Sequence, residues 1–398
     1  MTAPLPLEDA QRRLLALAGP LGSETVAAEL CVGRYLAADI AARRTQPAAD
    51  LSAMDGYAVA GKGPWQVVGE SAAGRPFTGR LERGEALRIS TGALIPAGGE
   101  AVLLQEEAIR EGSGLAAAPG GAPSPRHIRR RGFDFAEGEV VLGAGIGVGP
   151  AQLALALTAG HGGRIVEVGR LSRVTVIDSG DELAVTAEEW DDHRLPASNG
   201  AMIAAMAAPL AASVERLGPV PDRMEALTEA LARAEAADVV VTTGGASVGD
   251  HDLVRPALEA WGATIDFWRV AMKPGKPILL ARRGQQWILG LPGNPVSSYV
   301  TAFLFLLPLL RRLAGASECL PRALAARTSC ALPAGGARLE LIRARLDGGT
   351  VAPLGERDSS ALRSLAAANA LIERPIGAAA AATGDEVAVF PLGNGGIA

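Results

Sequence analysis

Cysteine, lysine and aromatic residues are scarce in this chain of 398 residues. Its three cysteines, Cys31, Cys319 and Cys330, form no CxxC pair, which fits neither a disulfide framework nor a zinc site. We therefore expect a reducing, cytoplasmic environment. The formal net charge is -5, whereas a protein that grips nucleic acid through phosphate contacts usually presents a dense basic face. Composition therefore favours small-molecule chemistry and no nucleic-acid partner.

Long apolar runs are also missing. The longest, Val296 to Leu310, spans about 15 residues, short of the roughly 20 that a membrane helix needs, and ends at Arg311. The N-terminal sequence MTAPLPLEDAQRR lacks the charged start and apolar run of a signal peptide. We expect no membrane partner and predict that the apolar run forms a buried helix.

Composition changes along the chain, and the length predicts about two to four domains. An Ala/Leu-rich pattern over residues 7–42, broken at Gly19, Pro20 and Gly22, predicts helices in the first 45 residues. Short β-like runs separated by glycine and proline then predict a small β-rich domain. These runs are Trp65 to Val68, Ala86 to Ile89 and Ala101 to Gln105.

Apolar runs alternate with amphipathic helices over residues 174–313, a pattern typical of βαβ units and a parallel sheet. The predicted strands are Arg173 to Ile177, Ala237 to Val241, Pro277 to Leu280 and Trp287 to Leu289. Residues 332–390 return to a β pattern, interrupted by a helix-like stretch at residues 360–370, and predict a separate C-terminal β domain.

Two helices are predicted between the first two of these strands. Ser198 or Asn199 can cap a helix that runs to about Leu217. Asp222 and Glu225 have the spacing of a capping box for a second helix, which would end near residue 236.

A glycine-rich loop at residues 242–252, TTGGASVGDHD, joins a predicted buried strand to a helix. Ligands of open parallel sheets bind at the carboxyl ends of strands. Glycine lets backbone N–H groups approach an anion, and a serine hydroxyl adds a donor. Gly244, Gly245 and Ser247 are therefore candidate ligand contacts. The alternative is a strand-to-helix turn that binds nothing.

Acidic residues follow two of the predicted strands. Asp250 and Asp252 lie two residues apart, which suits a Mg²⁺ ion that bridges substrate phosphates; the alternative is that either caps the next helix. The loop DSGDEL at residues 178–183 follows the predicted strand Arg173 to Ile177. Its position lets Glu182 reach the same ion. A solvated acidic turn is the alternative interpretation of that loop.

Two of the three lysines, Lys273 and Lys276, fall within the sequence RVAMKPGKP, which begins at Arg269. Prolines stiffen this loop, and ammonium groups act there as compact charges toward phosphate or another oxyanion. The alternative is a tight turn with exposed charges. Asn294, in LPGNPVS, follows the next strand and can face the same crevice, or simply mark a strand-turn-helix junction.

The β-rich region holds one isolated carboxylate, Asp55, in SAMDGYA. Asp55 is a candidate metal ligand or acid-base group, although an Asp-Gly pair is also a common turn. Thr91 in STG adds a hydroxyl, and residues 129–134 form an arginine cluster that ends in Asp134. An arginine run usually marks a solvated face.

Eight motifs occur in one order along the chain: SAMDGYAV, STGALIP, RRGFDF, SGDEL, SNG, TTGGASVGD, MKPGKP and LPGNPVS. Together they closely resemble the molybdopterin molybdenumtransferases, the bacterial MoeA proteins, whose eukaryotic relatives include the gephyrin E domain. The resemblance covers nearly the whole chain. Some positions depart from the family: Ala49 and Leu51 replace an aromatic residue and an asparagine, Glu100 replaces an aspartate, and Arg269 stands where relatives can have lysine.

The resemblance implies a multidomain α/β and β fold in an elongated homodimer. We expect a helical connecting part (residues 1–45 and 139–168), a β-rich lobe (46–138), a central doubly wound α/β domain of molybdopterin-binding type (169–318) and a C-terminal β-barrel-like domain (319–398). The family's active site lies in a cleft around the central domain, with contributions from the partner subunit.

The resemblance also implies an activity: insertion of molybdenum from molybdate into adenylylated molybdopterin, with Mg²⁺ and release of AMP. The expected catalytic residues are Asp55, Thr91, Asp134, Glu182, Lys273 and Lys276. The expected substrate-binding residues are Asp222, Gly244, Gly245, Ser247, Arg269 and Asn294. The expected metal ligands are Glu182, Asp250 and Asp252.

A molybdopterin adenylyltransferase and cofactor-free molybdoenzymes are the partners that this activity implies. Two alternatives stay open at this point. One is a related molybdopterin- or nucleotide-binding adenylyltransferase or pyrophosphatase, and the other is a non-catalytic scaffold.

Overall fold

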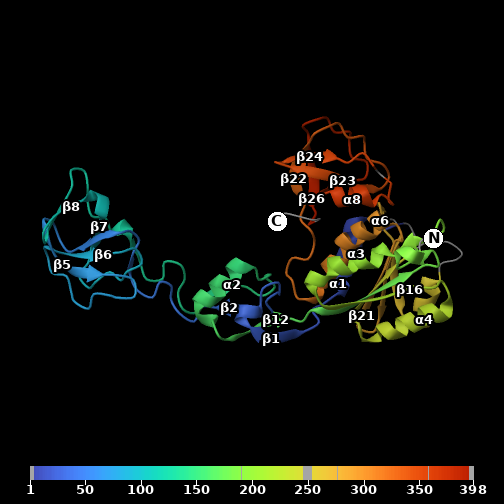
Figure 1. The fold of residues 1–398 in the computed structure, drawn as a ribbon, viewed down its shortest axis with the longest axis horizontal. Coiled ribbons are helices and arrows are strands. Elements are labelled where there is room, and N and C mark those ends of the chain that lie inside the picture. Colours follow the sequence, from blue (N-terminus) through green and yellow to red (C-terminus); the bar gives the residue numbers. More distant parts are fainter. Residues whose placement is uncertain (1–3, 190, 245–252, 276, 357, 394–398) are drawn as a thin grey trace.

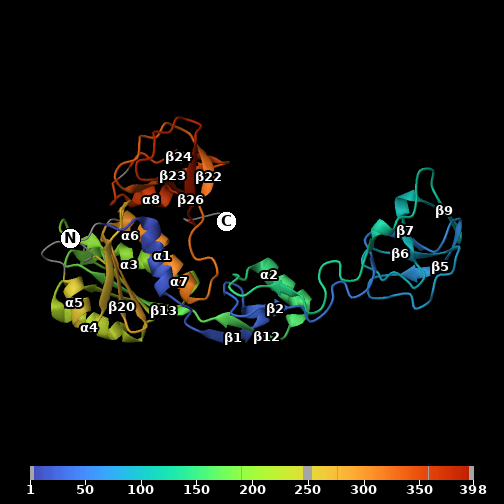
Figure 2. The same cartoon turned by 180° about the vertical axis from the view of Figure 1, so that it is seen from behind.

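The computed structural model describes residues 4–393, apart from 190, 245–252, 276 and 357. The molecule is elongated: the β-rich lobe lies at one end, the connecting part in the middle, and the central and C-terminal domains at the other end (Figure 1). The view from behind shows the same order (Figure 2). The predictions for five site residues fall outside the described part of the chain: Gly245, Ser247, Asp250, Asp252 and Lys276.

The central domain contains a six-stranded sheet. Its strands are β13 (Ser172–Ser179), β16 (Ala211–Val220), β17 (Val239–Thr243), β18 (Thr264–Arg269), β20 (Pro277–Arg283) and β21 (Gln286–Leu291). The order is β16-β13-β17-β21-β20-β18, with the first four strands parallel and the last two antiparallel to their neighbours. The four predicted strands are confirmed as β13, β17, β20 and β21.

Helices cover both faces of this sheet, as a doubly wound domain requires. The helices are α3 (Ser198–Ala207), α6 (Pro295–Thr301) and α7 (Leu307–Leu313) on one face, and α4 (Met224–Arg233) and α5 (Val254–Ala260) on the other. Successive side chains of a strand point to opposite faces. Accordingly Val239 and Val241 join the first core, and Val240 joins the second.

The long apolar run forms the central helix of the first core. A π-helical turn, Ala302–Leu306, joins α6 to α7, so that Pro295–Leu313 is one continuous helical segment. By length and composition this segment is able to cross a membrane, but 83% of its apolar window is buried inside the protein. The prediction of a buried helix is confirmed.

The predicted helix from Ser198 to Leu217 is too long. Helix α3 ends at Ala207, a short 3-10 turn containing Pro209 follows, and the chain then forms strand β16. The error arises because β16 pairs with one neighbour only and shows mostly exposed residues, so no apolar run marks it. The capping box is also wrong, since Arg223 precedes α4 and no side chain caps that helix.

The connecting part is less helical than predicted over residues 23–42. Strands β1 (Ser23–Ala27) and β12 (Ile165–Gly169) pair antiparallel, as do β2 (Ile40–Ala41) and β11 (Val140–Leu142). Backbone pairing with a distant segment overrides the helix preference of alanine and leucine. A short helix, α2 (Pro150–Ala156), packs against these strands.

Helix α1 (Leu7–Leu17) packs on the central domain, which corrects the prediction that it belongs to the connecting part. Its buried face, with Leu7, Ala10 and Leu14, belongs to the first core of the central domain. Gln11 also donates to the Leu304 carbonyl at 2.9 Å. Apolar residues at helical spacing thus pack this N-terminal helix against the helical segment Pro295–Leu313.

The lobe is built on a twisted six-stranded sheet in the order β7-β4-β6-β5-β9-β8. Its strands are β4 (Gly56–Val59), β5 (Trp65–Ser71), β6 (Glu85–Ile89), β7 (Ala101–Leu104), β8 (Ala108–Glu111) and β9 (Gly114–Ala117). Alternate residues fill separate small cores on its two faces. A two-stranded pair, β3 (Leu51–Ser52) with β10 (Ile128–Arg129), lies where the chain enters and leaves the lobe.

The C-terminal domain is a closed five-stranded barrel. Its strands are β22 (Leu324–Thr328), β23 (Leu339–Asp347), β24 (Thr350–Pro353), β25 (Ala370–Arg374) and β26 (Glu386–Pro391). Closure comes from the pairing of β23 with both β24 and β25. Helix α8 (Leu362–Ala367) packs beside it. The expected barrel-like domain is confirmed.

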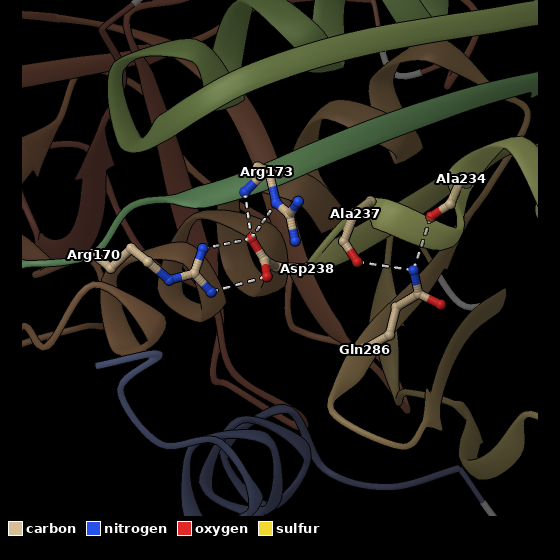
Figure 3. A network of polar contacts seen from close by, with 6 residues as sticks. All are labelled: Arg170, Arg173, Ala234, Ala237, Asp238 and Gln286. Carbon is tan, nitrogen blue, oxygen red and sulfur yellow. Dashed lines mark hydrogen bonds and ion pairs between the residues drawn. The ribbon is translucent and has the colours of Figure 1, made fainter. Parts of the chain in front are cut away.

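A polar network fastens the connecting part to the amino edge of the central sheet (Figure 3). Asp238, just before β17, accepts bonds from Arg170 Nη1 and Nη2 at 3.1 and 3.0 Å and from the Arg173 backbone N–H at 2.7 Å. Nearby, Gln286 Nε2 donates to the carbonyls of Ala234 and Ala237. These bonds link the connecting part to the amino ends of the strands, and the carboxyl ends carry the candidate site.

Candidate active site

Asp178 lies at the carboxyl end of β13 and is 2% exposed. The Thr243 hydroxyl, at the end of β17, donates to its carboxylate, and Arg216 Nη2 lies 3.7 Å from Oδ2. Burial raises the pKa of Asp178, and the bonds from Thr243 and Arg216 oppose that rise. A carboxylate at this depth joins three neighbouring strands, β13, β16 and β17. Its first role is to order the carboxyl ends of these strands, and we call the region around Asp178, Asn199 and Gly244 the crevice.

Two glycines let the backbone close around this carboxylate. A Cβ on Gly200, in the first turn of α3, would lie 2.0 Å from Asp178 Oδ2. Gly244, directly after β17, has φ +95°, and a Cβ there would lie 2.8 Å from the Ser179 carbonyl oxygen. Only glycine fits these two positions. The predicted ligand contact at Gly244 is therefore also a structural requirement.

Several buried polar atoms at this edge have no hydrogen-bond partner within the described part of the chain. They are Ser179 Oγ, Asn199 Oδ1 and Ser298 Oγ. Asn199 Nδ2 donates to the Gly293 carbonyl at 2.5 Å, which fixes the amide beside the glycine loop. Buried polar groups are normally paired, so within the described residues these three atoms are candidate contacts for a ligand.

The acidic loop concentrates negative charge beside this crevice. Asp181 Oδ1 accepts the Asp222 backbone N–H at 3.1 Å. Burial raises the pKa of Asp222, and the charges of Asp181 and Glu182 raise it further. A Cβ on Gly180 would lie 2.6 Å from Glu182 Oε2, so that carboxylate folds back over its own loop.

A hard divalent cation fits this acidic loop by charge and by ligand chemistry. The described residues alone contain no group of three side chains placed to hold a metal. Strand β17, which leads into residues 245–252, pairs directly with β13, which leads into the acidic loop. Parallel pairing therefore brings the starts of both loops to one edge of the sheet.

Lys273 lies on a segment held from both sides. The Ala271 N–H donates to the Leu5 carbonyl at 2.7 Å, and the Ala271 carbonyl accepts from the Leu339 N–H at 3.0 Å. Strand β19 (Met272–Lys273) thus pairs in parallel with β23 of the barrel. In this register Lys273 lies opposite Glu340, and Lys273 Nζ is 3.7 Å from Glu340 Oε1.

Arg269 begins the same segment at the end of β18. Its carbonyl accepts the Leu5 N–H at 3.1 Å, and it pairs with Pro277 of β20. The backbone of Arg269 is therefore part of the support that holds the lysine segment.

A cavity of about 370 Å³ opens between the central domain and the barrel. Its charged and hydroxyl-bearing lining residues are Lys273, Ser297, Arg338, Glu340, Arg343, Glu356, Asp358 and Ser359. Arg343 is buried and donates to the carbonyls of Glu356, Asp358 and Ala361 at 2.8 to 3.1 Å. Burial lowers the pKa of this guanidinium, and the charges of Glu356 and Asp358 oppose the change.

The start of α6 joins this cavity to the crevice. The Val296 N–H donates to the Ser359 carbonyl at 3.1 Å, and Ser297 lines the cavity. Asn294 is exposed, and its carbonyl accepts the Ser298 N–H at 2.9 Å. Its side chain caps nothing, so the amide is free to face a ligand at the crevice.

The lobe carries its own acidic site. Asp55 Oδ1 accepts the Thr91 backbone N–H at 2.6 Å and the Thr91 hydroxyl at 2.9 Å. These two bonds lower the pKa of Asp55, and Arg88 adds to the effect. The carboxylate bonds to another loop instead of its own Asp-Gly turn and is ionised at neutral pH.

Asp134 is the last residue of the arginine cluster at residues 129–134, and it is exposed. Its backbone N–H donates to the Gln46 carbonyl at 3.0 Å. In the same cluster, Arg130 Nη1 and the Arg131 N–H bind Asp50 at 2.6 and 2.8 Å. The arginine run is thus partly structural.

The lobe and the central domain lie at opposite ends of the same chain (Figures 1 and 2). Asp55 and Thr91 meet each other, and Lys273 meets the barrel, but one chain does not bring the two groups together. A site that uses both needs a second copy.

Three family models match successive parts of this chain. They are the MoeA N-terminal region (domains I and II) at residues 5–160, a probable molybdopterin-binding domain at residues 175–312 and the MoeA C-terminal region (domain IV) at residues 325–392. A molybdopterin molybdenumtransferase of Haemophilus influenzae is 35% identical over 323 residues, 79% of each chain. One of Staphylococcus aureus is 30% identical over 390 residues, 94% of this chain and 92% of that one.

The chain belongs to the MoeA family of molybdopterin molybdenumtransferases, enzymes of molybdenum cofactor biosynthesis. The crystal structure of the MoeA protein from Pyrococcus horikoshii OT3 matches with a TM-score of 0.82 at 27% identity, covering 98% of this chain and 100% of that one. A second Pyrococcus MoeA structure gives 0.75 at 28% identity, with 98% and 99% covered. The MoeA fold therefore extends over the whole molecule.

Sequence reasoning missed several residues that the MoeA fold gathers at the cavity. They are Ser297, Arg338, Glu340, Arg343 and Ser359. One signal was available, because an arginine interrupts the apolar run from Leu341 to Ala344, and a buried arginine needs partners. Ser297 also lies in the motif LPGNPVS, whereas Arg338, Glu340 and Ser359 carry no comparable local signal.

Proposed function

We propose that this chain inserts molybdenum from molybdate into adenylylated molybdopterin and releases AMP. The observation that carries the proposal is the start of α6, where the Gly293 carbonyl accepts a hydrogen bond from Asn199 at the crevice and Ser297 lines the cavity. Two anionic reactants bound on either side of this turn would lie next to each other. Proximity of this kind is itself a large catalytic contribution.

The cavity is assigned to molybdate, a tetrahedral dianion. Lys273, Arg338 and Arg343 supply positive charge, and Ser297 and Ser359 supply hydroxyl donors. Charge-assisted bonds from such groups suit an oxyanion. The cavity does not distinguish molybdate from tungstate, which has nearly the same size and charge.

The crevice is assigned to the adenylylated pterin. Its orphaned donors and acceptors at Ser179, Asn199 and Ser298 suit a ligand with many polar edges, and Gly244 lets it approach the backbone. Gly245, Ser247, Asp222 and Asn294 complete the proposed set of substrate contacts, with Arg269 beside them.

Mg²⁺ is proposed beside the phosphoanhydride, held by Glu182 with Asp250 and Asp252. The ion would neutralise charge on the phosphate oxygens during bond cleavage. The acidic loop supports this assignment, since the neighbouring charges that raise the pKa of Asp222 are those that a cation offsets.

The lobe of a second copy is proposed to complete the site. Asp55, ionised and oriented by Thr91, accepts a proton from the water whose oxygen bonds to phosphorus as the phosphoanhydride P–O bond breaks and AMP leaves, and Asp134 lies in the same lobe. Lys273 and Lys276 stabilise the charge that develops on the oxyanion. This arrangement makes the active enzyme a homodimer with two shared sites.

A cytoplasmic location and two kinds of protein partner follow from this function. A molybdopterin adenylyltransferase would supply the substrate, and cofactor-free molybdoenzymes would receive the product. No contact with nucleic acid or membrane is part of the proposal.

The test is AMP release from adenylylated molybdopterin by the purified chain with Mg²⁺, with and without molybdate, coupled to reconstitution of a cofactor-free molybdoenzyme. Molybdate-dependent release that yields active enzyme is expected. Release that ignores molybdate would make the chain a pyrophosphatase, and calorimetric binding without any release would make it a scaffold. Lys273→Ala is expected to abolish release, while Lys62→Ala removes the lysine in the lobe and is the matched control.

A further inference from the structure

One carboxylate that lines the cavity, that of Glu340, carries the same sign of charge as the oxyanion proposed to bind there. Three basic and three acidic side chains line it, although a cavity built only to hold a dianion needs no acids. Two of the acids are engaged by their own loop. Glu356 Oε1 accepts the Asp358 N–H at 2.8 Å, and Asp358 Oδ1 accepts the N–H and hydroxyl of Ser360.

Glu340 differs from these two acids. In the part of the chain that the structure describes, its basic partner is Lys273, at 3.7 Å. The Glu340 side chain is 27% exposed and that of Lys273 is 52% exposed, so the acid lies deeper than the base. An oxyanion that binds Lys273 must therefore share it with Glu340 or displace it.

The backbone holds Lys273 in place without help from the Glu340 side chain. Strand β19 is fixed by the bonds of Ala271 to Leu5 on one side and to Leu339 on the other. Removal of the Glu340 carboxylate would leave these bonds intact. The carboxylate is thus a countercharge and not the anchor of the segment.

We propose that Glu340 is a positioning residue that competes with the bound oxyanion for Lys273 and so keeps oxyanion binding weak enough for release to the pterin. The inference rests on the proposed placement of molybdate in this cavity. Weak, multi-partner binding is expected where a bound group must be passed on, because tight ground-state binding does not accelerate the transfer.

The experiment is isothermal titration calorimetry with sodium molybdate on the full chain and on Glu340→Gln. The amide keeps the size of the side chain and removes its charge. We expect the Kd to fall roughly fivefold, the scale of one partly exposed ion pair, and the dissociation rate to fall with it. A residue that only supports the fold would give the opposite result, weaker binding.

Three further variants make the result specific. Glu340→Asp keeps the charge and is expected to bind like the parent. Glu340→Gln in a Lys273→Ala background is expected to change the Kd by much less, because the shared partner is gone. Glu235→Gln, whose carboxylate pairs with Arg283 at 3.1 Å away from the cavity, controls for net charge and is expected to have no effect.

The outcomes separate this inference from the proposed function. If the parent chain does not bind molybdate, the assignment of the cavity itself is wrong. If the parent binds but Glu340→Gln binds equally or more weakly with an unchanged melting temperature, the role of Glu340 is wrong and the cavity assignment stands. An equal gain in molybdate affinity in the Lys273→Ala background would also overturn the role of Glu340. The carboxylate would then act on the anion through its charge alone and not through Lys273.

Discussion

Thr91 donates two hydrogen bonds to a single oxygen of Asp55, one from its backbone at 2.6 Å and one from its hydroxyl at 2.9 Å. Bonds to the charged form of a carboxyl group favour ionisation. Asp55 is therefore kept ionised while it remains exposed to a ligand. This relationship gives the lobe its chemical role in the proposed reaction.

Thr91→Val should shift the acid limb of the pH–rate profile to higher pH. The substitution removes the hydroxyl bond and leaves the backbone bond, so the pKa of Asp55 rises from its depressed value and protonation begins earlier as pH falls. The measurement is AMP release as a function of pH. Thr228→Val removes a hydroxyl bond to the Met224 carbonyl on α4 and serves as the control. An unshifted profile in a folded Thr91→Val chain would contradict the role of Asp55.

Mixing two inactive variants should restore activity if sites are shared between copies. Asp55→Ala disables the lobe and Lys273→Ala disables the cavity, so a dimer with one of each keeps one intact site. After joint refolding or co-expression, roughly a quarter of the sites should work if chains pair at random. Asp55→Ala mixed with Asp134→Ala is the control, since both changes lie in the lobe and neither site is intact. Equal recovery in both mixtures would refute the shared site.

Arg343→Met should destabilise the C-terminal domain. The side chain is buried, and its loss leaves the three carbonyls that it binds without a donor. We expect the free energy of unfolding to fall by about 2–4 kcal/mol in urea denaturation. Arg345→Met, an exposed position on the same strand, should change it by less than about 0.5 kcal/mol. Similar losses for both would show that the bonds of Arg343 contribute little.

Asp238→Asn should lower stability at neutral pH and much less in acid. Burial raises the pKa of Asp238, but Arg170 and Arg173 outweigh it and hold the pKa below its usual value. A depressed pKa stabilises the fold above the unfolded value of about 3.9 and ceases to do so as pH falls through the folded value. Unfolding at pH 7 should therefore show a loss of about 2 kcal/mol that shrinks toward pH 3.

The control for this pH series is Glu259→Gln. Its partner Arg255 lies one helical turn away on α5, and the Glu259 side chain is 51% exposed. Surface pairs of this kind contribute little, so no loss is expected at either pH. A loss at Asp238 that is independent of pH would indicate packing, and not charge, as its cause.

Strands with strong local patterns were predictable, and those defined by their partners were not. β17 is buried throughout and begins with the apolar run Val239–Val241, and β13 carries the apolar residues Val174, Val176 and Ile177. β16 lies at an edge with mostly exposed residues, and its alanine-rich approach from α3 favours a helix by propensity alone. β1 was missed for the same reason, because only its pairing with β12 makes it a strand.

The candidate site residues divide in a similar way between local pattern and domain packing. Gly244, Asp55 and Lys273 stand in motifs whose composition indicates chemistry. Glu340 and Arg338 do not, since they reach the cavity only when the barrel docks on the central domain. A contact that depends on the packing of two domains leaves no periodicity in either segment.

The short pairing of β19 with β23 has a consequence for how this architecture can vary. The lysine segment, residues 269–273, pairs with both domains. It bonds to Leu5 and β20 on one side and to Leu339 on the other. A chain trimmed of its barrel would lose the edge against which Lys273 is aligned, together with most of the cavity wall. The barrel is thus not an interchangeable module, because the position of Lys273 depends on it.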